Sequence, residues 1–147
     1  VTLAGPGGEW IEEAFDDPRV RWCGTLSDSE CFDLVAASDI GLLAYFDDEP
    51  YYEIVHPTKL SLYLAAMIPI VSGDARYVAR FIREHGIGVA VSRADFADAL
   101  AETVQNGALR RRQSEAAASI REQFFWDAIL DRAAAETQRI APVRSGA

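Results

Sequence analysis

Up to residue 91, the chain alternates between short apolar runs and longer segments in which apolar residues recur with helical spacing. The apolar runs predict strands that start at Val1 and then span 20–23, 39–45, 70–71 and 87–91. The segments between them predict helices at 8–17, 27–38, 57–67 and 75–86. Strands and helices that alternate in this way are typical of an α/β fold with a doubly wound, Rossmann-like parallel sheet, here of about five strands.

The last part of the chain has helical periodicity only. Apolar residues that share one helix face recur between Phe96 and Val104, and Asn106-Gly107 ends this helix. Two further amphipathic helices are predicted at 109–123 and 126–140, separated near Phe124 and Phe125. The aromatic residues 124–126 suit either a hinge between these helices or a place in the core.

Local signals predict where several of these helices begin and end. Ser27 with Glu30, and Ser92 with Asp95, have the sequence spacing of a capping box. Asp74 lies in position to cap the helix that follows it. Gly86 is expected to end a helix, and Gly88 to allow another backbone to approach a strand closely. In the first helix, Trp10, Ile11 and Phe15 are predicted to face inward.

The segment 56–72, HPTKLSLYLAAMIPIVS, contains the strongest functional signal. Pro57 suits the first position of a helix that is apolar on nearly every face. Lys59 is the only charged residue between Glu53 and Asp74, and it lies in the first turn, where the helix dipole disfavours a cation. Free N–H groups of the first turn together with a buried Lys ammonium predict a phosphate site.

The same segment carries a family resemblance. HPTKLSLYLAAMIPIV resembles the donor-binding segment of GT-B glycosyltransferases, in which a Pro-x-Lys-Leu turn opens a helix and an Ala-rich run leads to a Pro-Val strand. It is most similar to bacterial glucosyltransferases with the motif KLSxYLAAG, whose next helix and strand resemble ARFIREHGIGVAV at 79–91. The resemblance extends over residues 1–104, and it implies glycosyl transfer from a nucleotide-diphosphate sugar, of UDP type, to an unknown acceptor.

The resemblance also implies roles for individual residues. Lys59 is the expected catalytic residue, because its charge neutralises the leaving diphosphate without a metal or other cofactor. The candidate substrate-binding residues are His56, Thr58, Leu60, Ser61, Gly5, Gly24, Thr25, Leu26 and Glu53. Residues 24–26 are expected beside the nucleotide base, although an ordinary strand-to-helix turn is an equal alternative, as it is for Gly5. His56 is equally well explained as a surface or capping residue, and Ser61 as a packing residue.

Two residues depart from the family pattern. Many relatives have Glu where this chain has Leu62, and that carboxylate accepts the ribose hydroxyls of the nucleotide. Ribose recognition therefore falls to Glu53 or to a backbone group. Met67 replaces a Gly of the relatives and needs a roomier helix end.

The loop 46–55 is acidic and aromatic, and neither periodicity fits it. It is expected at the carboxyl end of a parallel strand, where open α/β sheets bind ligands. Its acidic residues are Asp47, Asp48, Glu49 and Glu53. They could contact sugar hydroxyls or a Mg²⁺ ion, and a solvated acidic loop is the simpler interpretation.

Composition narrows the function classes. The 147 residues carry a net charge of −9, which argues against nucleic acid as a partner, and the run Arg110–Arg112 is expected to be a solvated helix face. The two cysteines are expected to be reduced and buried. Without a signal peptide or a membrane span, a cytoplasmic location is expected, and peripheral membrane association of a full-length enzyme is compatible with the resemblance.

The expected organisation is one donor-binding C-terminal lobe at 1–141 followed by a tail at 142–147. The N-terminal acceptor lobe, and a strand before Val1, are expected to lie outside this sequence. Two alternatives stay open at this point: a nucleotide-sugar epimerase of the same architecture, and a degenerate, non-catalytic partner subunit of a glycosyltransferase.

Overall fold

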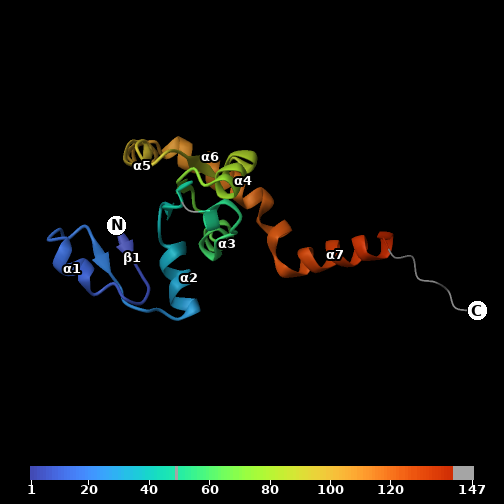
Figure 1. Ribbon diagram of the computed structural model, residues 1–147, viewed down its shortest axis with the longest axis horizontal. Coiled ribbons are helices and arrows are strands. Elements are labelled where there is room, and N and C mark those ends of the chain that lie inside the picture. The colour runs from blue at the N-terminus through green and yellow to red at the C-terminus, as the bar shows by residue number, and fades with distance from the viewer. Residues whose placement is uncertain (49, 141–147) are drawn as a thin grey trace, which may run out of the picture. The chain divides into compact units, whose positions relative to one another are not determined.

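The computed structural model describes residues 1–48 and 50–140, and the chain forms two compact units within it, Val1–Ser38 and a larger unit that starts at Asp39 (Figure 1). The expected tail at 142–147 lies outside the described residues. The fold is α/β and every strand pair is parallel in the described part of the chain, as predicted.

The first unit contains two strands and two helices, β1 (Thr2–Leu3), α1 (Trp10–Ala14), β2 (Arg21–Trp22) and α2 (Asp28–Ala36). β1 pairs with β2, with Thr2 opposite Arg21. The capping box of α2 is confirmed, because Ser27 N donates to Glu30 Oε2 at 2.8 Å and Glu30 N donates to Ser27 Oγ at 3.4 Å. In α1 only Ile11 is buried; the prediction that Trp10 and Phe15 face inward is wrong, since both are exposed.

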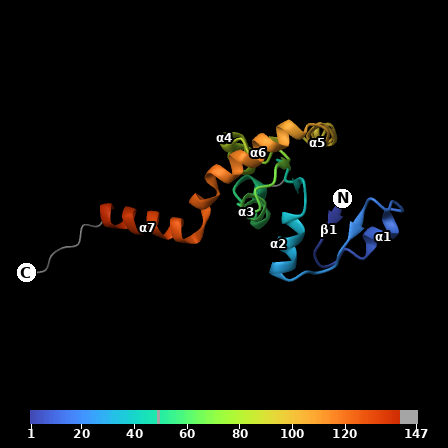
Figure 2. The same cartoon turned by 180° about the vertical axis from the view of Figure 1, so that it is seen from behind.

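The second unit is built on a sheet of three strands in the order β3-β4-β5. Figures 1 and 2 show the helices of this unit from two opposite sides. The strands are β3 (Gly41–Leu43), β4 (Ile70–Ser72) and β5 (Gly88–Ala90). The helical elements are the 3₁₀ turn η1 (Pro50–Glu53), α3 (Thr58–Ala65), α4 (Arg76–His85), α5 (Phe96–Gln105), α6 (Gly107–Ile120), the 3₁₀ turn η2 (Arg121–Phe124) and α7 (Trp126–Ile140). Leu43, Leu60, Ile70, Ile82 and Ile87 are fully buried and form the centre of its core.

The expectation of one sheet of about five strands needs correction. Among the described residues the five strands form two separate ladders, one of two strands and one of three. Gly5 and Gly24 explain why the first ladder is short, because they follow β1 and β2 with φ of 137° and 73°, outside the extended region. Each strand of this ladder is two residues long, and β2 is shorter than the predicted run 20–23.

The other helix-boundary predictions had mixed outcomes. Gly86 ends α4 with φ 64°, as expected. Ser92 Oγ accepts from Asp95 N at 3.3 Å, although α5 begins only after Asp95. The prediction that Asp74 caps α4 is wrong, because Ala75 is the N-cap residue and the N–H of Arg76 donates to Glu53 Oε1 at 3.4 Å instead.

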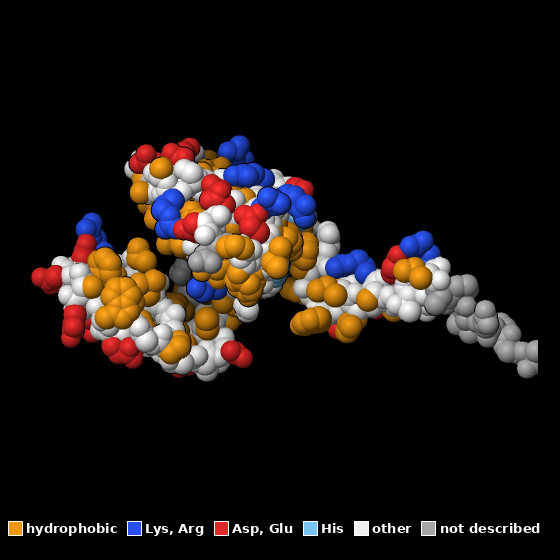
Figure 3. Space-filling view, viewed as in Figure 1, with side chains coloured by type: hydrophobic (Ala, Val, Ile, Leu, Met, Phe, Trp, Pro, Cys, Tyr) orange, Lys and Arg blue, Asp and Glu red, His pale blue; other side chains and the backbone are white. Residues whose placement is uncertain are grey.

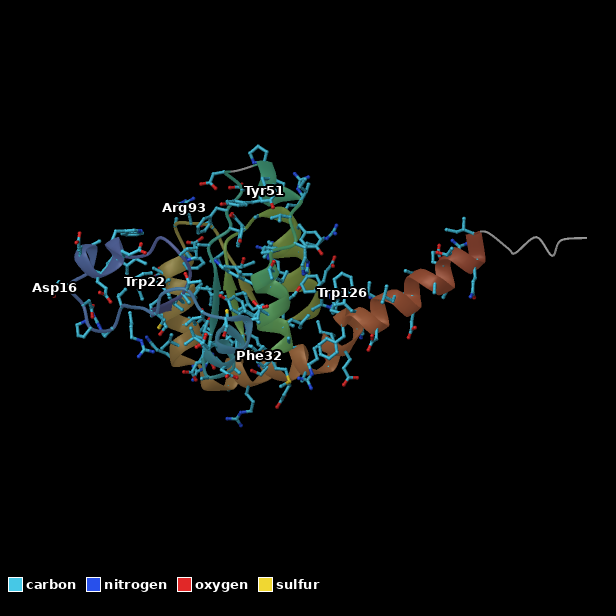
Figure 4. All side chains as sticks on the ribbon, turned by 90° about the horizontal axis from the view of Figure 1, so that it is seen from below. Asp16, Trp22, Phe32, Tyr51, Arg93 and Trp126 are labelled. Atoms are coloured by element: carbon cyan, nitrogen blue, oxygen red, sulfur yellow. The ribbon has the colours of Figure 1, made fainter. Side chains whose placement is uncertain are left out.

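Of the aromatic residues 124–126, one lies against the core. Phe124 packs against the core, with its ring centroid 5.2 Å from that of Phe81. Phe125 and Trp126 are exposed, and Trp126 stands at the start of α7 (Figure 4). No residue of α7 is buried, and exposed apolar side chains lie along it (Figure 3). None of the helices in residues 1–48 and 50–140 is long and apolar enough to span a membrane.

The C-terminal end of α3 is a Schellman motif with Met67 in the left-handed position. Ile68 N donates to Tyr63 O at 3.2 Å and Met67 N to Leu64 O at 3.0 Å, and φ of Met67 is 57°. This geometry favours Gly, which is the residue that the resemblance leads one to expect there. Met67 is half-buried against the core, so its side chain offsets part of the backbone strain.

A pair of variants isolates that strain. Met67→Gly and Met67→Ala both remove the side chain, so the difference between them reports on the backbone. We expect the Gly variant to be more stable than the Ala variant by about 1 kcal/mol, because a left-handed φ is unfavourable for any residue with a Cβ. Urea denaturation of both variants measures the difference, and an Ala variant of equal or greater stability would contradict the assignment.

Candidate functional site

The loops that follow β3, β4 and β5 lie at one edge of the three-stranded sheet, because the strands are parallel and their carboxyl ends point the same way. The first of these loops leads into α3, the second into α4 and the third into α5. Ligands of open parallel sheets bind at this edge. The candidate residues of the segment 53–61 belong to the first loop and the first turn of α3.

The first turn of α3 has unpaired backbone donors. Pro57 is the N-cap residue, one position earlier than its predicted place inside the helix, and its side chain cannot accept a hydrogen bond. Leu60 N donates to Pro57 O at 2.9 Å. The N–H groups of Thr58 and Lys59 have no partner within residues 1–48 and 50–140. Two donors at the positive end of the helix dipole therefore face outward.

Lys59 is exposed, so the expectation of a buried ammonium is wrong. It lies about 100° around the helix from Leu60, which points into the core, and this angle takes its side chain to the surface. Lys59 makes no ion pair or hydrogen bond with any described residue. The Lys59 ammonium is thus available to form an ion pair with an anion from solution.

His56 bridges α3 and α4. Its Nε2 lies 2.8 Å from Ser61 Oγ on α3, and its Nδ1 lies 3.0 Å from Tyr77 OH on α4. The imidazole edge packs on the rings of Tyr77 and Phe81, with centroids 5.6 and 5.9 Å away. Partial burial among these rings lowers the pKa of His56 below its usual value.

The lowered pKa of His56 predicts how stability depends on pH. The folded protein binds this proton less readily than the unfolded chain, so stability falls as the pH drops through the unfolded value of about 6.5 and levels off below the folded pKa. Melting temperatures between pH 8 and pH 5 test this expectation. The His56→Gln variant should show a flatter profile, and an unchanged profile would contradict a role for His56 in this dependence.

Glu53 binds Arg76 at the start of α4. Its Oε2 lies 3.0 Å from Arg76 Nε, and its Oε1 accepts from Arg76 N. The carboxylate thereby stabilises the N-terminus of α4, which is the role that the sequence assigned to Asp74. Leu60 is fully buried, so its side chain belongs to the core and not to the surface of the site.

A hollow of about 460 Å³ at the same sheet edge is lined by charged residues, among them Asp47, Glu53, Asp74 and Arg76. Asp74 Oδ1 is buried and has no hydrogen-bond partner among the described residues. Within residues 1–48 and 50–140, no three His, Cys, Asp or Glu side chains are grouped so that they could hold a metal ion.

Asp47 and Asp48 of the acidic loop differ in whether they form an ion pair. Asp48 is paired with Arg93, whose guanidinium lies 4.1 Å from the ring centroid of Phe46. Arg93 is labelled in Figure 4. Glu49 lies outside the described residues. Asp47 and Asp74 are therefore the carboxylates of the hollow that have no ion-pair partner in the described part of the chain.

In the first unit, the structure brings two candidate glycines together. Gly5 N donates to Gly24 O at 2.8 Å, and Trp22 Nε1 donates to Gly5 O at 3.0 Å. The N–H groups of Gly24 and Thr25 have no partner among the described residues. Leu26 is half-buried and Thr25 is exposed. The turn 24–26 thus has backbone donors available for a ligand.

Sequence reasoning missed Tyr77 as a site residue. The phenol hydroxyl was the signal that could have identified it, since a half-buried phenol needs a hydrogen-bond partner. The two cysteines are free and half-buried, less enclosed than predicted.

A family model described as "Glucosyltransferase 3-like, C-terminal domain" matches residues 6–133, which is nearly the whole chain. No curated protein matches the sequence. The matched range includes the turn 24–26, all of α3 and α4, and about half of α7.

Proposed function

Since the chain belongs to the family of glucosyltransferase 3-like C-terminal domains, we propose that it is the donor-binding lobe of a hexosyltransferase that uses a nucleotide-diphosphate sugar, of UDP type. The family match over residues 6–133 is the observation that carries this proposal. The unpaired cation and backbone donors at the start of α3 support it, because they form a site suited to a diphosphate.

In the proposed mechanism, the donor diphosphate binds at the N-terminus of α3. The N–H groups of Thr58 and Lys59 donate to its oxygens, and the Lys59 ammonium lies against its negative charge. Negative charge grows on the diphosphate as the bond to the sugar breaks, so these groups stabilise the transition state more than the bound donor. The Thr58 hydroxyl is exposed in the same turn and is a further donor.

The rest of the donor is assigned to the remaining candidate residues. The free N–H groups of Gly24 and Thr25 are proposed to contact the nucleotide base. Leu62 cannot accept ribose hydroxyls and Glu53 is held by Arg76, so the ribose is assigned to backbone groups. The unpaired carboxylates of Asp47 and Asp74 line the hollow and are suited to sugar hydroxyls.

The proposal includes an organisation larger than the described elements. An N-terminal lobe supplies the acceptor site and any catalytic base, and residues 1–141 act as one donor-binding lobe. The first unit supports this view, because its sheet has only two strands and its apolar Val1, Leu3, Trp10 and Phe15 are exposed. Such a small ladder is not expected to be stable without further pairing or cover.

Addition of UDP to the full-length protein tests the proposal. We expect a saturable rise in thermal stability, equivalent to about 2.7 kcal/mol when UDP is present at a hundredfold excess over its Kd. ADP provides the control for the base, and tryptophan fluorescence gives a second readout. If the full-length protein does not respond to UDP, the interpretation as a degenerate, non-catalytic partner subunit is favoured. Leu62, which cannot accept ribose hydroxyls, also favours that interpretation.

A further inference from the structure

The way the chain enters α3 is unusual for a helix N-terminus. Helices commonly begin with a Ser, Thr, Asp or Asn cap, whose side chain accepts a hydrogen bond from an N–H of the first turn. Pro57 stands in the cap position of α3 and makes no such bond. The donors of the first turn stay available, but the local interaction that normally fixes the turn is missing.

His56 supplies a different restraint at this point. The bond between its Nε2 and Ser61 Oγ closes a short ring of chain that contains Pro57 and the whole first turn. The bond between its Nδ1 and Tyr77 OH ties the same ring to α4. Both partners are hydroxyls, which donate or accept as needed, so either tautomer of the imidazole satisfies both bonds.

The α4 end of this bridge is anchored in the core. Val78, Phe81 and Ile82 are buried in the core, and Tyr77 and Phe81 stack with their ring centroids 6.4 Å apart. The hydroxyl of Tyr77 is therefore held by a helix that packs on β4 and β5. Through His56, the first turn of α3 takes its position from the core of the unit.

The helix geometry separates this bridge from the ligand groups. Ser61 and Lys59 are two residues apart, so their side chains leave α3 about 160° from each other. Ser61 points to His56, and Lys59 leaves the opposite side of the helix. Since both ring nitrogens of His56 are occupied by protein hydroxyls, the imidazole has no nitrogen left for a phosphate.

We propose that His56 is a positioning residue for the donor diphosphate, which acts by holding the first turn of α3 against α4 through Ser61 and Tyr77. The inference rests on the proposed function, because the turn that His56 holds is the proposed diphosphate site. The resemblance implied that His56 and Ser61 contact the substrate directly. In the present inference both residues act indirectly, by positioning the first turn of α3.

The decisive variant is Tyr77→Phe, which removes one hydroxyl at the far end of the bridge. We expect it to weaken UDP binding by the full-length protein about fivefold, the equivalent of one lost hydrogen bond. Tyr63→Phe is the matched control, because it also removes a tyrosine hydroxyl that tethers α3, in this case one that donates to Leu42 O at 3.3 Å on β3. The control is expected to retain the UDP affinity.

Rescue by a similar side chain separates positioning from general stability. His56→Ala is expected to lose at least as much affinity as Tyr77→Phe, whereas His56→Gln keeps an amide that can donate and accept, and should recover most of it. Titration calorimetry gives the affinities, and melting curves confirm that each variant is folded. If His56→Ala does not fold, the UDP affinities of Tyr77→Phe and of its control Tyr63→Phe still test the positioning role of His56.

The outcomes distinguish this inference from the function on which it rests. UDP binding by the unmodified protein together with unchanged affinity in Tyr77→Phe would overturn the positioning role and leave the proposed function standing. Equal losses in Tyr77→Phe and Tyr63→Phe would also overturn it, because they indicate a general loosening of α3. Absence of UDP binding by the unmodified protein would overturn the function and the inference together.

Discussion

Lys59→Ala is expected to weaken UDP binding by the full-length protein about 30-fold. The estimate corresponds to the loss of a charge-assisted contact of about 2 kcal/mol at the diphosphate. Stability should hardly change, because Lys59 is exposed and makes no ion pair or hydrogen bond with the described residues that its removal would break. Titration calorimetry with UDP and a melting curve measure the two quantities.

Two further variants sharpen the Lys59 experiment. Lys59→Arg keeps the charge and should lose much less affinity, although its planar group does not reproduce an ammonium. Arg112→Ala removes an exposed cation of α6 and controls for the change in net charge. If Lys59→Ala and Arg112→Ala lowered the UDP affinity equally, the loss would reflect overall charge and the diphosphate site would be misassigned.

Gly88→Ala is expected to lower the free energy of unfolding by about 3 kcal/mol, because β4 and β5 cannot separate to admit a methyl group. A Cβ at this position would lie 2.1 Å from Ile70 O and 2.8 Å from Ile70 C, both backbone atoms of the paired strand. The sequence predicted this close approach. Urea denaturation followed by circular dichroism measures the loss.

Gly107→Ala is the matched control for Gly88→Ala. A Cβ there would have Arg110 Nη2 as its nearest neighbour, at 3.8 Å, in the first turn of α6. Stability is expected to stay within about 0.5 kcal/mol or to rise, since alanine suits a helix better than glycine. Similar losses in the two variants would show that the contact with Ile70 is not the cause.

Short-range patterns predicted the larger unit well. The alternation of apolar runs and helical segments placed β3, β4, β5, α3 and α4 in the right order. Lys59 stood out because helix dipoles disfavour a cation in the first turn, and the structure leaves that cation without a protein partner. Its exposure was also within reach of the sequence, because Leu60 and Leu64 define the buried face of α3.

The errors arise where partners are distant in sequence. Asp74 was the local choice to cap α4, but Glu53, 23 residues before Arg76, accepts that N–H instead. The hydrogen bond between His56 and Tyr77 joins residues 21 positions apart, and no sequence periodicity predicts it. Apolar runs likewise do not show where a ladder stops: the run 20–23 forms a strand only at Arg21–Trp22.

A crystal structure of the full-length protein with UDP tests the central claim most directly. The account predicts the diphosphate at the N-terminus of α3, with its oxygens about 3 Å from Lys59 Nζ and from the backbone nitrogens of Thr58 and Lys59. A diphosphate bound elsewhere, with the Lys59 ammonium in solvent, would contradict it.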